Sequence, residues 1–180
     1  MKFLNIGCGR DIRRDKNPDV EWINLDRTKP ADVIADLEEP LPFKDNTFKL
    51  VFAHSILEHI RNYTQLQSEI YRVLEPHGQL QAHVPDYTSP DAYGDPDHVR
   101  MFSFHSFYTM YWYGMIVKDL RHYTINNPKG ISTNFPELQI APHLWIHATL
   151  VKLTPSELMD GLKMGLWDQK MGCWQPEHTK

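Results

Sequence analysis

Short apolar runs recur through the first half of the chain, each ending near a glycine, a proline or a polar residue. Runs of this length that are apolar on both faces are typical of strands in a parallel sheet. We interpret five of them as buried strands. They comprise residues 2–7, 21–26, 33–36, 49–55 and 78–85.

A helical pattern stands between the fourth and fifth runs. Apolar side chains recur there at helical spacing from Tyr63 to Leu74. Asn62 can cap the start of this helix, and Pro76 and Gly78 can end it. A strand, a helix and a strand in this order predict a right-handed crossover between parallel strands.

The second half of the chain is less regular. Thr154 and Glu157 predict a capping box with Pro155 at the first helical position, so we expect a final helix there. No stretch of the chain resembles a linker, and we expect one domain over residues 1–180. The other expected elements are a loop over 86–100, an aromatic helix over 104–113, strands over 115–125 and 144–153, and an insertion or long turn over 126–143.

Composition narrows the possible partners and compartments. The chain has 180 residues and a formal net charge of −4, with Lys and Arg scattered along it, which argues against a nucleic-acid partner. Cys8 and Cys173 stand far apart and give no disulfide framework, so we expect a reducing, cytoplasmic location. No apolar run approaches the ~20 residues of a membrane span, and the first residues lack the pattern of a signal peptide.

The first two strands end in residues suited to a nucleoside. Gly7-Cys8-Gly9 follows the first strand, where glycine lets the backbone turn sharply and lets a ligand approach closely. Asp26 ends the second strand, where a carboxylate can accept the hydroxyl protons of a ribose. Each feature alone also fits an ordinary turn or cap, but together they predict a nucleoside at the carboxyl ends of parallel strands.

The glycine pattern differs from that of dinucleotide-binding proteins. Their fingerprint needs a third glycine that opens a helix facing a pyrophosphate. Here Arg10 and Asp11 follow the second glycine, and Pro18 interrupts the segment before the second strand. A ligand that has a ribose but no pyrophosphate fits this pattern better.

Four blocks resemble class I S-adenosylmethionine-dependent methyltransferases. They are LNIGCGR, INLDR, DLEEPLPFKDNTFKLVFAHSILEHI and YRVLEPHGQL, in the family's order and spacing over residues 3–85. The resemblance implies an α/β fold: a single Rossmann-like methyltransferase domain with a mostly parallel seven-stranded sheet in the order 3-2-1-4-5-7-6. It also implies helices on both faces of that sheet, with the first helix shortened because little room lies between Gly9 and Glu21.

The resemblance implies S-adenosylmethionine as the cofactor and a set of residues that bind it. Asp26 is implied for the ribose hydroxyls and Asp36 for the adenine amino group. For His54, and also for His59, the alternative is that the side chain only caps the turn from strand to helix. The implied cofactor-binding residues are Gly7, Gly9, Asp26, Arg27, Asp36, Leu37, Ala53 and His54.

The acceptor side of the site is expected in the loop after the fifth strand. Its DPDHVRMF stretch resembles a narrower group of small bacterial and viral methyltransferases of type 11. We expect His98 to act as a general base, because its ordinary pKa suits proton removal near neutral pH, with Asp95 orienting its ring. The alternative is that Asp95 and Pro96 form a turn and His98 caps a helix. The residues expected to line the acceptor pocket are Asp86, Tyr87, Arg100 and His105.

These observations favour an enzyme that transfers a methyl group to a small molecule, such as a sugar, a nucleotide or another metabolite. The alternative is a methyltransferase-fold interaction module that binds the cofactor weakly or not at all, and an NAD-dependent oxidoreductase comes third. The short first helix leaves the cofactor site open, so we expect a homodimer partner or residues 126–143 to cover it. No set of Cys and His residues has the spacing of a zinc site, and no metal is expected.

Overall fold

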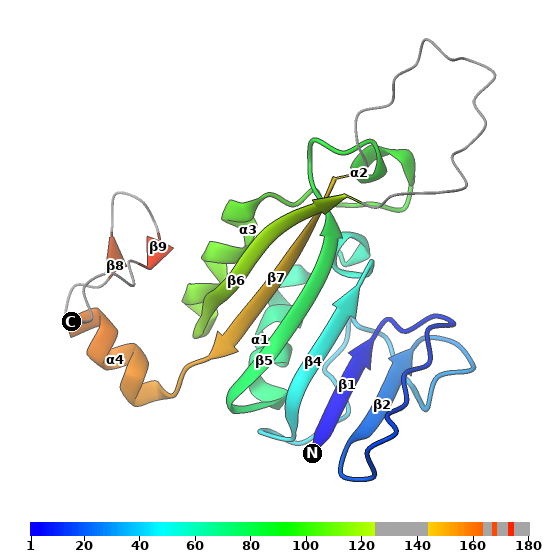
Figure 1. The fold of residues 1–180 in the computed structure, drawn as a ribbon, viewed down its shortest axis with the longest axis horizontal. Coiled ribbons are helices and arrows are strands. Elements are labelled where there is room, and N and C mark those ends of the chain that lie inside the picture. The colour runs from blue at the N-terminus through cyan, green and yellow to red at the C-terminus, as the bar shows by residue number, and fades with distance from the viewer. Residues whose placement is uncertain (125–143, 164–166, 169–172, 175–180) are drawn as a thin grey trace.

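The computed structural model describes residues 1–124, 144–163, 167–168 and 173–174. Its centre is a seven-stranded sheet in the order β3-β2-β1-β4-β5-β7-β6, which confirms the predicted order (Figure 1). The first five strands pair in parallel, and β7 is antiparallel to both β5 and β6. The strands are β1 (Lys2–Ile6), β2 (Glu21–Asp26), β3 (Val33–Ile34), β4 (Phe48–His54), β5 (Leu74–Pro85), β6 (Met115–Thr124) and β7 (Leu144–Lys152).

Among the described residues, helices lie between β4 and β5, between β5 and β6, and after β7. Of the described helices, none is long and apolar enough to cross a membrane. Residues 125–143, where we expected the end of a strand and an insertion, lie outside the described residues. The helices are α1 (Tyr63–Val73), α2 (Asp91–Gly94), α3 (Phe104–Tyr108) and α4 (Pro155–Lys163), with the 3-10 helices η1 (Leu57–His59) and η2 (Thr109–Tyr113); a small hairpin pairs β8 (Trp167–Asp168) with β9 (Cys173–Trp174).

The helix starts follow the capping signals of the sequence. The Asn62 side chain accepts a hydrogen bond from the Gln65 N–H at the start of α1. At the start of α4, Glu157 accepts from the Thr154 N–H, which completes the predicted capping box. The end of α1 differs from expectation: Leu74 does not continue the helix but already begins β5.

The expected aromatic helix over 104–113 is divided into α3 and η2. Ser103 and Ser106 form a capping box at its start. Phe107 and Met110 are fully buried, and they point into the core that the sheet forms with α1.

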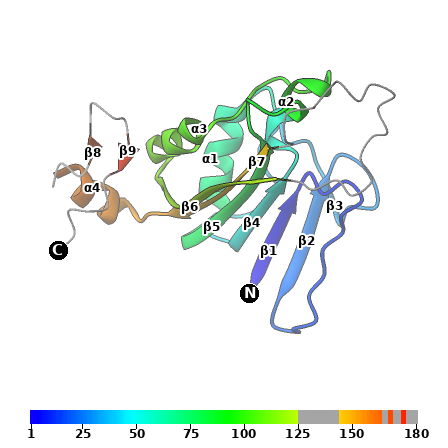
Figure 2. The ribbon, with the colours of Figure 1, turned by 45° about the horizontal axis from the view of Figure 1, so that its top comes forward.

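The core lies on one face of the sheet. Figure 2 shows α1 and α3 above the same face. Alternate residues of the central strands point into this layer and are fully buried, among them Leu4, Val51 and Leu80, against Leu66 and Ile70 of α1. Because side chains alternate along a strand, these buried residues share one face of the sheet.

The opposite face carries no helix among the described residues, so the sheet is not covered by helices on both sides there. The segment between β1 and β2 lies on that face in irregular form, and the Arg13 guanidinium stands 3.7 Å from the ring centre of Phe52. Asn5 and Asn24 bond to each other, and Asn24 accepts from the Arg13 N–H. Polar and cation–π contacts therefore take the place of the shortened helix.

Arg72 fixes the loop before β4 onto α1. Its guanidinium donates to both carboxylate oxygens of Glu69, to Asp45, and to the backbone oxygens of Leu41 and Phe43. These hydrogen bonds lower the pKa of Glu69 although its partial burial acts in the opposite direction. The Arg72 side chain thus donates hydrogen bonds to two loop carbonyls and to two carboxylates.

We expect Arg72→Met to lower the free energy of unfolding by about 2–3 kcal/mol, because several charge-assisted hydrogen bonds are lost and Glu69 stays partly buried without its cation. Urea denaturation measures this change. The control is Arg61→Met, since the exposed Arg61 side chain makes no ion pair with described residues. Equal losses in the two variants would contradict the prediction.

Candidate functional site

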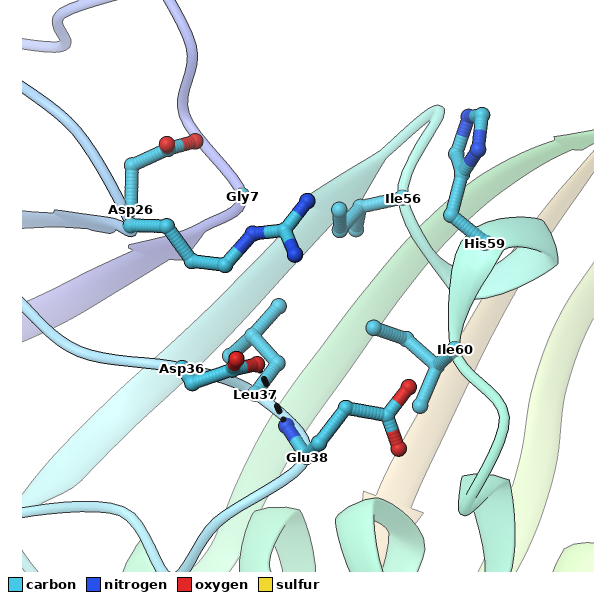
Figure 3. Close-up of a pocket in the computed structure, with 9 residues that line it drawn as sticks. Gly7, Asp26, Asp36, Leu37, Glu38, Ile56, His59 and Ile60 are labelled. Carbon is cyan, nitrogen blue, oxygen red and sulfur yellow. Dashed lines mark hydrogen bonds between the residues drawn. The ribbon is translucent and has the colours of Figure 1, made fainter. Parts of the chain in front are cut away.

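A pocket of about 110 Å³ opens where β1, β2 and β4 end (Figure 3). Ligands of open α/β sheets bind along this edge. One side of the pocket carries Asp26 and Asp36, and His59 lies across from them. The residues that line it are Gly7, Asp26, Arg27, Asp36, Leu37, Glu38, Ile56, His59 and Ile60.

Gly7 is required by the turn at the floor of this pocket. Its φ is +60°, which side-chain-bearing residues rarely adopt. A Cβ added at Gly7 would stand 2.2 Å from a carbon of Ile56. The turn after β1 and the turn after β4 therefore lie directly against each other. Gly9 also has a positive φ, of +50°, but no atom lies near the position of an added Cβ.

The Asp26 carboxylate is held at a fixed position. One oxygen accepts from the Gly9 N–H at 2.9 Å, and the other accepts from the N–H and hydroxyl of Thr28. These donors come from the two turns that flank the acid. The carboxylate thus presents its remaining acceptor capacity to the pocket without side-chain rearrangement.

Asp36 and Glu38 connect two walls of the pocket. Asp36 accepts from the Glu38 N–H, as the dashed line in Figure 3 shows. The Glu38 carboxylate accepts from the N–H groups of Arg61 and Asn62, at the start of α1. The loop after β3 is therefore tied to the segment that carries His59.

Five of the eight residues expected to bind the cofactor line this pocket. Gly9 does not line it, but its N–H donates a hydrogen bond to Asp26, which does. Ala53 is fully buried on the helix-covered side of β4. His54 points to the other side of the sheet, where its ring stacks on Trp145 at 5.9 Å, and burial lowers its pKa. The strand alternates its side chains, so neighbouring positions cannot both face one ligand.

Glu38, Ile56 and Ile60 were not predicted as site residues, and the His59 side chain was expected to cap the turn from strand to helix. A signal for them exists in the chain. Ile56, His59 and Ile60 all lie in the SILEHI segment directly after β4, and residues at the carboxyl end of a parallel strand border such sites. Only the 3-10 turn of η1 decides which of them face the pocket.

A second and larger pocket, of about 480 Å³, lies beside the first residues after β5. Asp86, Tyr87 and His105 line it as expected, whereas Arg100 does not. The other lining residues are Met101, Phe102, Ser103, Phe104 and His122. The pocket combines aromatic surface with an acid and two histidines, which suits a small polar molecule with an apolar part.

Asp86 and His122 form the polar centre of the second pocket. The His122 Nε2 lies 2.9 Å from the Asp86 carboxylate, and Phe104 stacks on the His122 ring. Burial favours a higher pKa for Asp86, but hydrogen bonds from Thr88 and His122 outweigh it, and the pKa is lowered. Asp86 therefore stays ionised, and its role includes holding His122 in place.

His98 and Arg100 lie between the two pockets. The His98 ring stands 4.6 Å from that of His59, and its side chain is 9% exposed. Its Nδ1 contacts the Ala92 carbonyl, while Asp95 lies 4.0 Å from Nε2, so the ring is oriented by Ala92 rather than by Asp95. Arg100 donates to the Ile60 carbonyl and holds the loop on η1.

The acid beside His98 is unusual. Glu58 is 1% exposed, and neither carboxylate oxygen has a hydrogen-bond partner among the described residues. This burial raises the pKa of Glu58 to about 7, although its own backbone N–H and, to a smaller extent, His98 act in the opposite direction. Burying a carboxylate without hydrogen-bond partners destabilises the folded state, which indicates that Glu58 has a functional role and not only a packing role.

Known proteins match this chain mainly in its first half. Residues 4–82 match the family model of a methyltransferase domain. An uncharacterized protein of Methanocaldococcus jannaschii is 36% identical over 86 residues, which cover 43% of this chain and 37% of that protein. The ubiquinone/menaquinone biosynthesis C-methyltransferase of Hydrogenovibrio crunogenus is 35% identical over 78 residues, which cover 40% of this chain and 31% of that protein. The chain thus matches about a third of the length of these curated relatives.

Solved structures extend the similarity of fold beyond that half. An S-adenosylmethionine-dependent methyltransferase of Methanosarcina mazei superposes with a TM-score of 0.60, over 84% of this chain and 92% of the other. The two sequences are 13% identical. This likeness shows that the two chains share their fold, over a larger part of this chain than the sequence matches cover.

Gly7→Ala and Gly9→Ala form a matched pair that tests the floor of the first pocket. Both replacements strain a backbone with positive φ, at about 1 kcal/mol each. Only the Gly7 variant also clashes with Ile56, so we expect it to lose a further ~1–3 kcal/mol of unfolding free energy. Guanidinium denaturation compares them, and a Gly9 variant that is the less stable would refute this view of the turn.

Proposed function

From the match of residues 4–82 to the family model of a methyltransferase domain, we propose that the chain is a class I S-adenosylmethionine-dependent methyltransferase that methylates a small molecule. The observation that carries the proposal is the first pocket. Gly7, Asp26 and Asp36 lie at or after the ends of three different strands, and all three line the same pocket. A nucleoside cofactor would be bound by residues placed in this way.

The residues of the first pocket fit S-adenosylmethionine. The Gly7 turn leaves the backbone bare where the ligand passes, because nothing larger than hydrogen fits beside Ile56. The Asp26 carboxylate is positioned to accept hydrogen bonds from the ribose hydroxyls, and Asp36 to accept one from the adenine amino group. Leu37 supplies apolar surface for a flat ring. The cofactor, when bound, supplies a methyl group on a positively charged sulfur.

The second pocket supports a small molecule as the acceptor. Residues 98–105 border both pockets, because His98 contacts His59 of the first while Phe102 to His105 line the second. An acceptor held by Asp86, Tyr87 and His105 would be near the cofactor. Positioning of donor and acceptor is the main contribution an enzyme makes to such a displacement, on the order of 7–11 kcal/mol.

The alternative is an interaction module that has the fold but not the activity. The sheet face opposite α1, which carries no helix among the described residues, is the observation that favours it. Calorimetric titration separates the possibilities: S-adenosylmethionine binding supports the enzyme, NAD binding supports an oxidoreductase, and binding of neither supports the module. Screening a cell extract for methylated products would then identify the acceptor.

We expect Asp26→Asn to weaken binding of S-adenosylmethionine by about 10–100-fold. The amide keeps the size of the side chain but loses charge-assisted hydrogen bonds worth ~1.5–3 kcal/mol. Isothermal titration calorimetry measures the affinity. Asp15→Asn, at an exposed position outside the pocket, serves as the control. An unchanged affinity in the Asp26 variant would refute the placement of the ribose.

We further expect that His98 serves the acceptor and not the cofactor. His98→Ala should leave the affinity for S-adenosylmethionine within about twofold while it lowers turnover by ~10²–10⁴. Equilibrium binding and single-turnover transfer to the identified acceptor measure the two effects separately. Loss of cofactor binding would move His98 into the cofactor site, and full turnover would make it structural.

A further inference from the structure

Glu58, His59 and His98 bring three potential metal ligands together beside the first pocket. One ligand atom from each residue lies within 4.8 Å of the other two. Glu58 and His59 belong to η1, and His98 comes from the loop after α2. The Val99 N–H donates to the Glu58 carbonyl at 2.9 Å, which holds this loop against η1.

The backbone sets the tautomer of both imidazole rings in their neutral form. The Nδ1 of His59 lies 3.2 Å from the Asp97 carbonyl, and the Nδ1 of His98 lies 3.2 Å from the Ala92 carbonyl. A carbonyl oxygen can only accept, so each Nδ1 carries the proton and each Nε2 keeps its lone pair. Histidines that bind metals are commonly oriented in this way, by donating their other ring N–H to a carbonyl.

The Glu58 side chain is an independent indication that a cation binds here. Its side chain is 1% exposed, and both oxygens lack a hydrogen-bond partner among the described residues. Buried charges in proteins are otherwise paired or bound to a metal ion. A cation between Glu58 and the two imidazoles would satisfy both oxygens of an acid that no described side chain pairs.

We propose that Glu58, His59 and His98 bind one divalent transition-metal ion of the zinc class. Two imidazoles and one carboxylate are typical of sites that keep a coordination position open for a water or a substrate. Ligands at ~2.0–2.2 Å from one ion lie at most about 4.4 Å apart, so small side-chain rotations complete the set. No spacing of residues along the chain predicts this site, because His98 is distant from the other two.

The position of the site suggests its use. His59 also lines the first pocket, so an ion held by these residues would border that pocket and could bind an acceptor beside the cofactor. An acceptor hydroxyl bound to the ion loses its proton to water at a lower pH than a free hydroxyl does. The lone pair of His98 then coordinates the ion, and His98 does not itself remove the proton. This use rests on the proposed function, whereas metal binding itself does not.

The test uses the full chain, stripped with a chelator and titrated with Zn²⁺ by calorimetry, and with Co²⁺ followed by its visible absorption. We expect one ion per chain, with a dissociation constant on the order of 1 μM or tighter. Glu58→Gln, His59→Gln and His98→Gln should each weaken binding by at least ~100-fold. The control is His77→Asn, which removes an exposed imidazole at a φ of +61° that asparagine tolerates.

Thermal melting separates loss of the site from loss of the fold. Without metal, Glu58→Gln should melt no lower than the wild type, because a buried charge is replaced by a neutral group of equal size. Zn²⁺ should raise the melting temperature of the wild type but not of this variant. Binding that survives all three substitutions, or no binding at about 1 mM Zn²⁺, would overturn the inference.

The same protein distinguishes this inference from the proposed function. Stripped protein that binds S-adenosylmethionine but no metal would overturn the metal site alone, and His98 would remain a candidate base. Protein that binds Zn²⁺ through the three residues but no S-adenosylmethionine would overturn the methyltransferase proposal alone.

Discussion

The close approach of Gly7 to Ile56 is the constraint on which the rest of the site depends. It brings the turn after β1 against the turn after β4, so that only a hydrogen fits between them. Since β1 also pairs with β2, the same approach fixes Asp26 relative to the segment that carries His59. A larger residue at position 7 would separate these turns, and the acids and the histidine would no longer border one space.

Polar contacts between loops then hold the other walls. Glu38 joins the loop after β3 to the start of α1, and Arg100 joins the loop after β5 to the carbonyl of Ile60. Both contacts connect a loop to backbone groups of residues 60–62, between η1 and α1, so this short segment is the common support. Catalytic loops of α/β proteins need such support, because a loop alone does not keep side chains in a fixed geometry.

The sheet face opposite α1 shows how a short connection changes a familiar architecture. The segment between β1 and β2 contains Pro18 and several charged residues and forms no helix. It covers the sheet through the Arg13 contacts with Phe52 and through hydrogen bonds of Asn24. Further along the same face, His83 bonds to His147 and to Tyr123. Polar and aromatic side chains thus occupy a surface that apolar helices commonly bury.

The order of the strands was implied only by the family resemblance, whereas the sequence by itself determined the strands of the first half of the chain, the caps of α1 and α4, and the positions of Gly7, Asp26 and Asp36. These features depend on local periodicity and on backbone preferences, which neighbouring residues encode. Only the tertiary structure decided that His54 faces away from the pocket while His59 borders it, and that Arg100 supports a loop. It alone brought His98 to Glu58, because contacts between distant segments arise from packing and not from any pattern along the chain.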